Sequence, residues 1–160
     1  MTSEQVKAWL QEYIPLKFEA ENRREYLKHL KACAEQLPTQ DCDSGLHARS
    51  NYELLALAQE HYIEYGKEYL PLIEANEKQM QVIGAAIRSV PDLLGSEVLR
   101  LRYMAADGCR PLPWKVIARE LYGWGTRKNV KAAYRLHRAA LEYLAQQITE
   151  APQYEQNTHK

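Results

Sequence analysis

The segment IARELYGWGT, residues 117–126, decides how the C-terminal part of this chain folds. Its Ile-Ala-x-x-Leu beginning has helical spacing, and Thr126 is a good N-cap for a helix that starts directly after it. Between them lie two glycines and two large aromatic side chains, which indicate a connection. The segment therefore predicts a helix, a turn and a second helix. It leaves open whether the connection covers 122–128 or ends at the cap.

Two more predicted elements belong to this C-terminal part. Residues 92–106 place apolar side chains along one helical stripe and precede an Asp-Gly pair, which is a natural helix stop. We expect residues 109–112 to form a loop and Pro113 to occupy the first position of the next helix. The last helix is expected to run from the Thr126 cap to about Ile148.

Ahead of residue 92 the sequence predicts two long helices. They cover residues 3–37 and about 51–90, and the polar stretch between them is rich in turn-forming residues. Pro15 is expected to kink or break the first helix, and Pro71 to kink the second. Two such helices joined by a short linker predict an antiparallel hairpin. We therefore assign residues 1–91 to a helical hairpin, residues 92–148 to a three-helix module, and the chain to the all-α class.

Each of the two long helices carries a seam of mostly apolar residues with steps of three and four. Ser3 is expected to cap the first helix, and Ser50 or Asn51 is expected to cap the second. Pro91 is expected to end the second helix. The predicted seams consist of Ala20, Arg23, Leu27, Leu30, Ala34 and Leu37 in the first helix, and of Leu55, Ala58, Tyr62, Tyr65, Tyr69, Leu72, Asn76, Met80, Ile83 and Ile87 in the second.

Charge is distributed unevenly along the chain, although the net charge is zero. Residues 1–91 contain ten Lys and Arg against fourteen Asp and Glu, whereas residues 92–148 contain ten against five. Residues 149–160 add one net negative charge and are expected to form a flexible tail. A neutral chain with one basic third is typical of a DNA-binding module joined to an acidic scaffold.

The basic residues of the last predicted helix share one face. Arg127, Lys131, Arg135 and Arg138 step by four, four and three, and Lys128 adds a cation at the helix start. Cations near a helix N-terminus oppose the helix dipole, so helix stability alone does not explain them. In a helix-turn-helix, the N-terminal residues of the second helix reach base edges in the major groove, and Arg can form two hydrogen bonds with guanine. A solvated helix face is the alternative interpretation.

The segment 97–144 resembles region 4 of sigma-70 factors. It carries Val-Leu-x-Leu-Arg-Tyr, then Ile-Ala-x-x-Leu, and then an apolar pattern that ends in Ala-Leu-x-x-Leu. It resembles more closely the small phage-encoded regulators of the RinA and ArpU kind, which also place a helical segment ahead of such a module. The departure is the turn, which is longer here than the usual three residues. The motif residues are Val98, Leu99, Leu101, Arg102, Tyr103, Ile117, Ala118, Leu121, Ala133, Leu136, Ala140, Leu141 and Leu144.

The resemblance implies a helix-turn-helix with a packed core and a DNA-contacting surface. The implied core residues are Val98, Leu101, Tyr103, Trp114, Ile117, Ala118, Leu121, Leu136, Ala140, Leu141 and Leu144. The implied DNA-binding residues are Arg127, Lys128, Lys131, Arg135, Arg138, Lys115 and Arg119. Two further side chains are assigned from general preferences. We expect Trp124 to be a core plug, with an exposed wedge beside DNA as the alternative, and His137 to pack or to contact phosphate.

Several other classes of protein are disfavoured by the sequence. The chain has three cysteines, an odd number, and they are not closely paired: Cys33, Cys42 and Cys109. We therefore expect no disulfide scaffold, and we expect the protein to reside in the reducing cytoplasm. We find no signal peptide and no apolar run long enough to span a bilayer. His29 and His47 could join two of the cysteines around zinc, but the spacing is irregular. No phosphate-binding loop or nucleophile motif is present, so neither an enzyme nor a cofactor is expected.

These patterns together predict a sequence-specific DNA-binding transcription regulator. The resemblance implies that it belongs to a bacterial phage or prophage and acts on late, packaging or lysis genes. The expected partners are double-stranded DNA of the host nucleoid and, through the N-terminal hairpin, host RNA polymerase or a second copy of the chain. Two alternatives remain, a small terminase-like DNA-packaging subunit and a helical adaptor that does not bind DNA.

Overall fold

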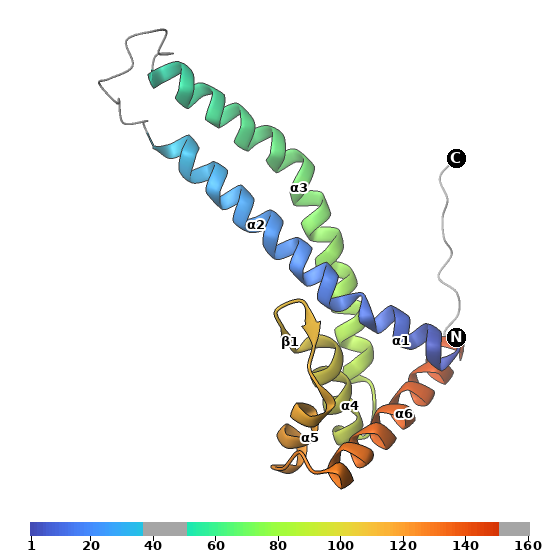
Figure 1. Cartoon of the computed structure of the whole chain (residues 1–160). Coiled ribbons are helices and arrows are strands. Elements are labelled where there is room, and N and C mark those ends of the chain that lie inside the picture. Colours follow the sequence, from blue (N-terminus) through green and yellow to red (C-terminus); the bar gives the residue numbers. More distant parts are fainter. Residues whose placement is uncertain (37–50, 151–160) are drawn as a thin grey trace. The chain divides into compact units, whose positions relative to one another are not determined.

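The computed structural model describes residues 1–36 and 51–150, and these residues are almost entirely helical (Figure 1). This confirms the predicted all-α class. The helices are α1 (Ser3–Gln11), α2 (Tyr13–Glu35), α3 (Asn51–Arg88), α4 (Leu93–Leu99), the π-helical turn η1 (Arg100–Met104), α5 (Trp114–Tyr122) and α6 (Arg127–Glu150). Two two-residue strands, β1 (Ala106–Asp107) and β2 (Arg110–Pro111), lie between η1 and α5.

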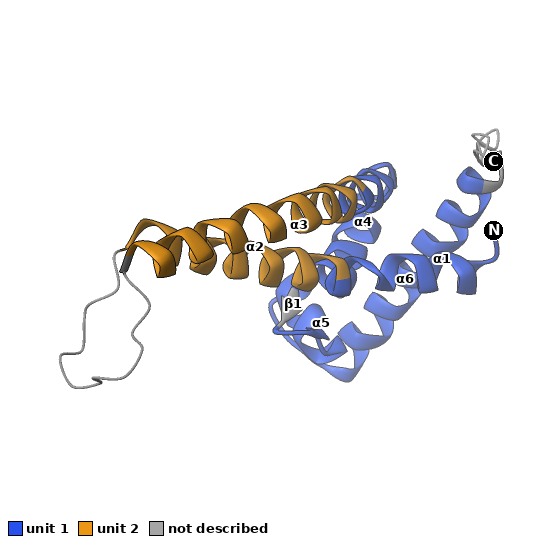
Figure 2. Cartoon of the chain, turned by 90° about the horizontal axis from the view of Figure 1, so that it is seen from above, with its two compact units in different colours: residues 1–15, 79–160 blue, residues 16–78 orange. Residues whose placement is uncertain are grey.

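The described residues divide into two compact units (Figure 2). Unit 1 contains residues 1–15 together with the chain from residue 79 onward, and unit 2 contains residues 16–78. This division differs from the predicted boundary between residues 91 and 92. The physical reason is that α1 and the last turns of α3 bury their apolar side chains in the C-terminal module.

Unit 1 is organised around α6, which contacts α1, α4 and α5, while α4 also contacts α5. The π-helical turn that follows α4 closes on a hydrogen bond from the Ala105 N–H to the Arg100 carbonyl, at 3.0 Å between nitrogen and oxygen. The turn buries Leu101 and Tyr103. The side chains that fill this core are Val6, Leu10, Ile14, Ile83, Ile87, Val90, Val98, Leu99, Leu101, Tyr103, Ile117, Ala118, Ala133, Ala140, Leu141, Leu144 and Ala145.

Unit 2 consists of α2 and the first part of α3, which run side by side (Figure 2). Ala20 and Leu27 of α2 bury themselves against Ile73 of α3. Gly66 lies in the middle of α3, where glycine is less favourable than alanine by about 1 kcal/mol. Apart from its chain neighbours and the backbone of its own helix, no atom lies within 4 Å of the place that a Cβ would take there.

The predicted seam of α3 is confirmed at most of its positions and wrong at Leu72. Leu72 is 42% exposed, whereas the next residue, Ile73, is 4% exposed. Ile73 lies four residues after Tyr69, so its side chain faces α2 as that of Tyr69 does. Leu72 lies three residues after Tyr69, which turns its side chain towards the edge of the interface. Leu37 of the other seam and Ser50, a predicted cap of α3, lie outside the described residues.

The first helix begins at Ser3 as predicted, but its cap and the position of the break after it differ from the prediction. Thr2, not Ser3, caps α1, because its hydroxyl accepts the Gln5 N–H and the Gln5 side chain accepts the Thr2 N–H. The break comes at Glu12, before Pro15, which is the third residue of α2. A proline is tolerated there because first-turn N–H groups have no partner within the helix. Helix α3 continues through Pro71 without ending.

The connection between η1 and α5 is a short antiparallel ladder, where a loop over 109–112 was predicted. Ala106 pairs with Pro111, and Asp107 pairs with Arg110. Gly108 takes a φ of 64° in the turn between them, which glycine adopts without a steric penalty. The Asp-Gly pair thus starts a hairpin turn after the helix has ended.

Leu10→Ala tests whether α1 is part of the C-terminal core. Leu10 is fully buried in unit 1, so we expect its truncation to lower the free energy of unfolding by about 2–5 kcal/mol. Leu93→Ala is the matched control, since Leu93 is 85% exposed, and it should change stability by less than about 0.5 kcal/mol. Urea denaturation measures both. Equal effects of the two substitutions would show that α1 is not packed as described.

Candidate nucleic-acid interface

The turn between α5 and α6 is four residues long, from Gly123 to Thr126. Gly123 ends α5 in the left-handed conformation with φ of 78°, and its N–H donates to the Arg119 carbonyl. Gly125 packs so closely that an added Cβ would lie 2.7 Å from the Lys115 carbonyl oxygen. Both glycines are therefore required by the backbone, one for its φ and the other for close approach.

Helix α6 begins at Arg127, directly after its cap. The Thr126 hydroxyl accepts the Asn129 N–H at 3.3 Å, and the Asn129 side-chain amide donates to the Trp124 carbonyl at 2.8 Å. The alternative of a long loop over 122–128 is therefore wrong, and the longer helix starting after Thr126 is correct. The two hydrogen bonds tie the turn to the first residues of α6.

Trp124 is 75% exposed, so the expectation of a core plug is wrong. It stands between the two constrained glycines, whose backbone geometry leaves its side chain facing solvent. Its exposure is compatible with the alternative of an exposed wedge, whose contact with DNA stays a prediction.

The predicted DNA-binding residues are all exposed. Arg138 forms an ion pair with Glu142 at 2.9 Å, and Arg119 lies 3.9 Å from its neighbour Glu120. The other five, Arg127, Lys128, Lys131, Arg135 and Lys115, have no ion pair within the described ranges. Helix α6 thus has one apolar face in the core and, opposite it, a row of unpaired cations along its first half.

Of the predicted core residues, eight are buried and three are half-buried. The half-buried ones are Trp114, Leu121 and Leu136. The buried ones are Val98, Leu101, Tyr103, Ile117, Ala118, Ala140, Leu141 and Leu144. The contribution of α1 was missed, because the spacing of Val6, Leu10 and Ile14 indicates a buried face and does not identify the surface on which that face packs.

An aromatic cluster supports the inner side of α6. The Trp114 and Tyr134 rings stack with centroids 4.1 Å apart, and Trp114 also meets the edge of His137 at 5.0 Å. The Arg102 guanidinium lies 5.0 Å from the centre of the Trp114 ring and donates to the Leu112 carbonyl at 2.6 Å. These contacts hold the first half of α6 against α5 and η1.

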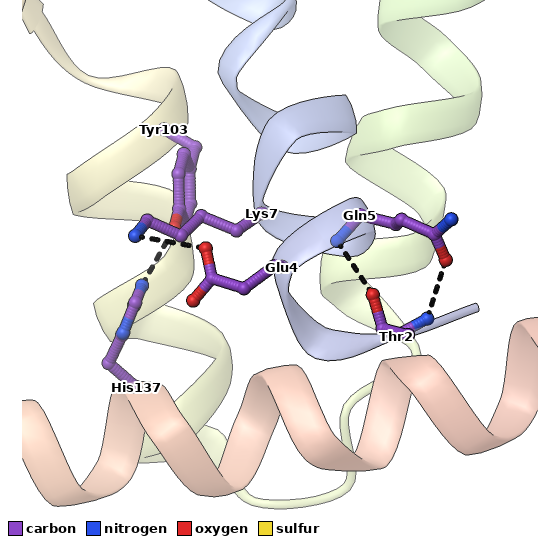
Figure 3. A network of polar contacts seen from close by, with 6 residues as sticks. All are labelled: Thr2, Glu4, Gln5, Lys7, Tyr103 and His137. Carbon is purple, nitrogen blue, oxygen red and sulfur yellow. Dashed lines mark hydrogen bonds and ion pairs between the residues drawn. The ribbon is translucent and has the colours of Figure 1, made fainter.

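His137 is buried in this cluster, so it packs in the core and its ring is not exposed for contact with a phosphate. Its Nε2 lies 2.8 Å from the Tyr103 hydroxyl, close enough for a hydrogen bond in either ring tautomer (Figure 3). Figure 3 also shows Glu4 and Lys7 of α1 beside this pair. Helix α1 therefore covers the only buried polar pair of this part of the described core.

Burial shifts the pKa values of both partners. The pKa of His137 falls from 6.5 to about 4, because burial disfavours the imidazolium and the nearby Arg102 and Lys7 charges add to this effect. The pKa of Tyr103 rises from 10.0 to about 12, again mainly through burial. At neutral pH the pair is therefore uncharged, so it contributes packing and a hydrogen bond rather than a charge for binding or catalysis.

The zinc alternative receives no support from the residues that can be described. His29 and Cys33 lie 3.7 Å apart between Nε2 and Sγ on α2, whereas Cys42 and His47 lie outside the described residues. No group of three potential metal ligands occurs within 1–36 and 51–150. No described helix is long and apolar enough to cross a membrane.

Comparisons with known proteins add no further information, because no family model, curated protein or solved structure matches the chain. The site is therefore defined by its own geometry. It consists of a helix with an unpaired cationic face, a capped and rigid turn, and an exposed tryptophan at that turn.

Stability as a function of pH tests the burial of His137. A histidine whose pKa is lower in the folded than in the unfolded chain stabilises the fold above pH 6.5, and this contribution is lost as the pH falls to about 4. The loss should amount to about 3 kcal/mol. His137→Gln, which cannot become charged, should lack this component when unfolding free energies of both chains are compared across that pH range. Parallel curves would mean that His137 is not buried in the neutral form.

A pair of tryptophan truncations tests the assignment of Trp124. Trp124→Ala should change the free energy of unfolding by less than about 0.5 kcal/mol, because the side chain is exposed. Trp114→Ala should lower it by roughly 3 kcal/mol, because its ring packs on Tyr134 and His137. Chemical denaturation of both variants gives the comparison. A large loss for Trp124→Ala would restore the core-plug interpretation.

Proposed function

We propose that this chain is a sequence-specific DNA-binding transcription regulator of a bacterial phage or prophage, and that the first half of α6 enters the major groove. The observation that carries the proposal is the row of exposed, unpaired cations Arg127, Lys128, Lys131 and Arg135 on the side of α6 that faces away from the core. The resemblance to sigma-70 region 4 and to regulators of the RinA and ArpU kind supports it.

The energetics of α6 favour a ligand over a purely structural role for these cations. Like charges at the N-terminal end of a helix are unfavourable, both to one another and to the positive end of the helix dipole. In this chain no described carboxylate pairs with them. A DNA phosphate backbone would supply the missing negative charge, and counterion release would add to the affinity.

The geometry of the turn suggests separate roles for the cations. Arg127, Lys131 and Arg135 follow one another at intervals of about one helical turn, so they can track along base edges in a groove. Lys128 lies to one side of this row and Lys115 on the preceding helix, where phosphate contact is the natural role. The exposed Trp124 ring would lie next to the sugar-phosphate backbone at the start of α6.

Removing three cations from α6 tests the proposal. The triple substitution Arg127→Ala, Lys131→Ala and Arg135→Ala should weaken DNA binding roughly 100-fold, since each lost contact contributes about 1 kcal/mol or more. The side chains are exposed and outside the core, so helicity should be unchanged. Fluorescence anisotropy with a selected duplex measures the affinity, and circular dichroism the helicity.

A matched control removes the same charge elsewhere. Lys67→Ala, Lys78→Ala and Arg88→Ala together also delete three exposed cations, all outside α6. This control should weaken binding only slightly, through the long-range field. If the two triple variants bind DNA with equally reduced affinity, the assignment of α6 to the major groove is rejected. If the wild-type chain does not bind DNA at low salt, a helical adaptor becomes the better interpretation.

A further inference from the structure

Unit 1 contains a hollow that is bounded by α1, η1, α5 and α6. Its volume is about 590 Å³, and pockets that bind small molecules typically measure roughly 300–1,000 Å³. Twelve residues line it, all of them within the same compact unit, and five of the twelve belong to α6. An occupant of the hollow would therefore lie against the helix that we assign to DNA.

Among the residues whose side chains are described, Arg102 is the one cation lining this hollow that has no carboxylate partner. Lys7 pairs with Glu4 at 3.5 Å, and Arg138 pairs with Glu142 at 2.9 Å. These two pairs compensate each other's charge within the hollow. Three cations and two carboxylates line it, so the lining carries one net positive charge.

The guanidinium of Arg102 is held in place by two contacts. Its Nη1 donates to the Leu112 carbonyl at 2.6 Å, and its central carbon lies 5.0 Å from the centre of the Trp114 ring. No other described group accepts a hydrogen bond from it, so Nε and Nη2 remain for a ligand. These two N–H groups form a planar fork, which matches a carboxylate that accepts two parallel hydrogen bonds.

His137 supplies a second polar group to the hollow. Only 8% of this residue is exposed, and its Nε2 lies 2.8 Å from the Tyr103 hydroxyl (Figure 3). Its Nδ1 has no hydrogen-bond partner in the described part of the chain, where no side-chain nitrogen is both sealed from solvent and unpartnered. Nδ1 is therefore open to the hollow that His137 lines. When the Tyr103 hydroxyl donates to Nε2, the ring proton lies on Nδ1, which can donate it to a ligand.

The fixed charges make this position attractive to an anion. The charges of Arg102 and Lys7 lower the pKa of His137, and each has a larger effect than the opposite effect of Glu4. The Glu4 side chain is also 84% exposed, so solvent and salt screen its charge. A negative ligand would therefore be stabilised beside His137, whereas a positive one would be repelled.

We propose that this hollow binds a small aromatic monocarboxylate. The carboxylate would accept hydrogen bonds from Arg102 and from Nδ1 of His137, and its single negative charge would balance that of the lining. A carboxylate alone is too small to fill the hollow, so the ring would occupy the space beside Tyr134 and Leu141. This site goes beyond the proposed function and does not depend on DNA binding, so the experiments below use the full chain without DNA.

Titration with benzoate and phenylacetate tests the site directly. In amide NMR spectra at neutral pH, at least one of them should shift the Trp114 indole N–H and the backbone amides around His137 in a saturable way. The dissociation constant should be millimolar, as expected for ligands of about ten non-hydrogen atoms. Benzamide and phenylacetamide have nearly the same shape without the charge, and should bind about tenfold more weakly. No saturable shift with either carboxylate, or equal affinity of the amides, overturns the proposal.

Arg102→Lys tests the hydrogen-bonding fork. The variant keeps the positive charge and loses the two parallel donors, so benzoate should bind about tenfold more weakly. Because Arg102 also contacts Trp114 and Leu112, circular dichroism is used to check that the variant folds. Unchanged affinity in the folded variant would rule out the assigned role of Arg102.

A substitution that should strengthen binding gives a test that unfolding cannot imitate. Glu142→Gln removes the partner of Arg138, which raises the net charge of the lining, so benzoate should bind about threefold more tightly. Glu120→Gln is the matched control, because it also removes the exposed partner of an arginine, Arg119, but does not line the hollow. The control should leave the affinity unchanged. Equal affinities of the two variants for benzoate would contradict the placement of the ligand in this hollow.

Discussion

Packing of one face of α6 against α1, α4 and α5 is the interaction on which unit 1 depends. Small residues permit the close approach, since Ala133 and Ala140 of α6 and Ala118 of α5 are all buried. Larger side chains such as Leu144 fill the space beside them. Because this packing fixes the rotation of α6 about its axis, it also determines which residues face away from the core. The row of cations is exposed for that reason, and its direction is set by apolar contacts on the opposite side.

The same packing explains the composition of the turn before α6. Gly123 reverses the chain in the left-handed region, and Gly125 passes close to the Lys115 backbone. Thr126 and Asn129 then complete the hydrogen bonds at the start of α6. A turn so constrained holds α6 at a defined angle to α5. A rigid support of this kind is what a recognition helix needs, because small errors in orientation displace every side chain that reaches a groove.

Much of this fold could be predicted from local sequence, and the rest depends on contacts between distant segments. The all-α class, the Thr126 cap and most of the core of the C-terminal module follow from helical spacing and turn residues. The membership of α1 in that core could not be derived from its amphipathic pattern alone, because the pattern does not name the partner surface. Trp124 was misplaced for a related reason. It lies between two constrained glycines, and one of them, Gly125, is constrained by its close approach to Lys115, ten residues earlier in the chain.

The central claim is that the cationic face of α6 binds DNA, and the most direct measurement is a selection of bound duplexes from a random pool at two salt concentrations. We expect an enriched sequence and an affinity that falls with salt, with a logarithmic slope of about 0.9 for each phosphate that the cations neutralise. The opposite result, with no duplex retained at low salt and no sequence enriched, would contradict it.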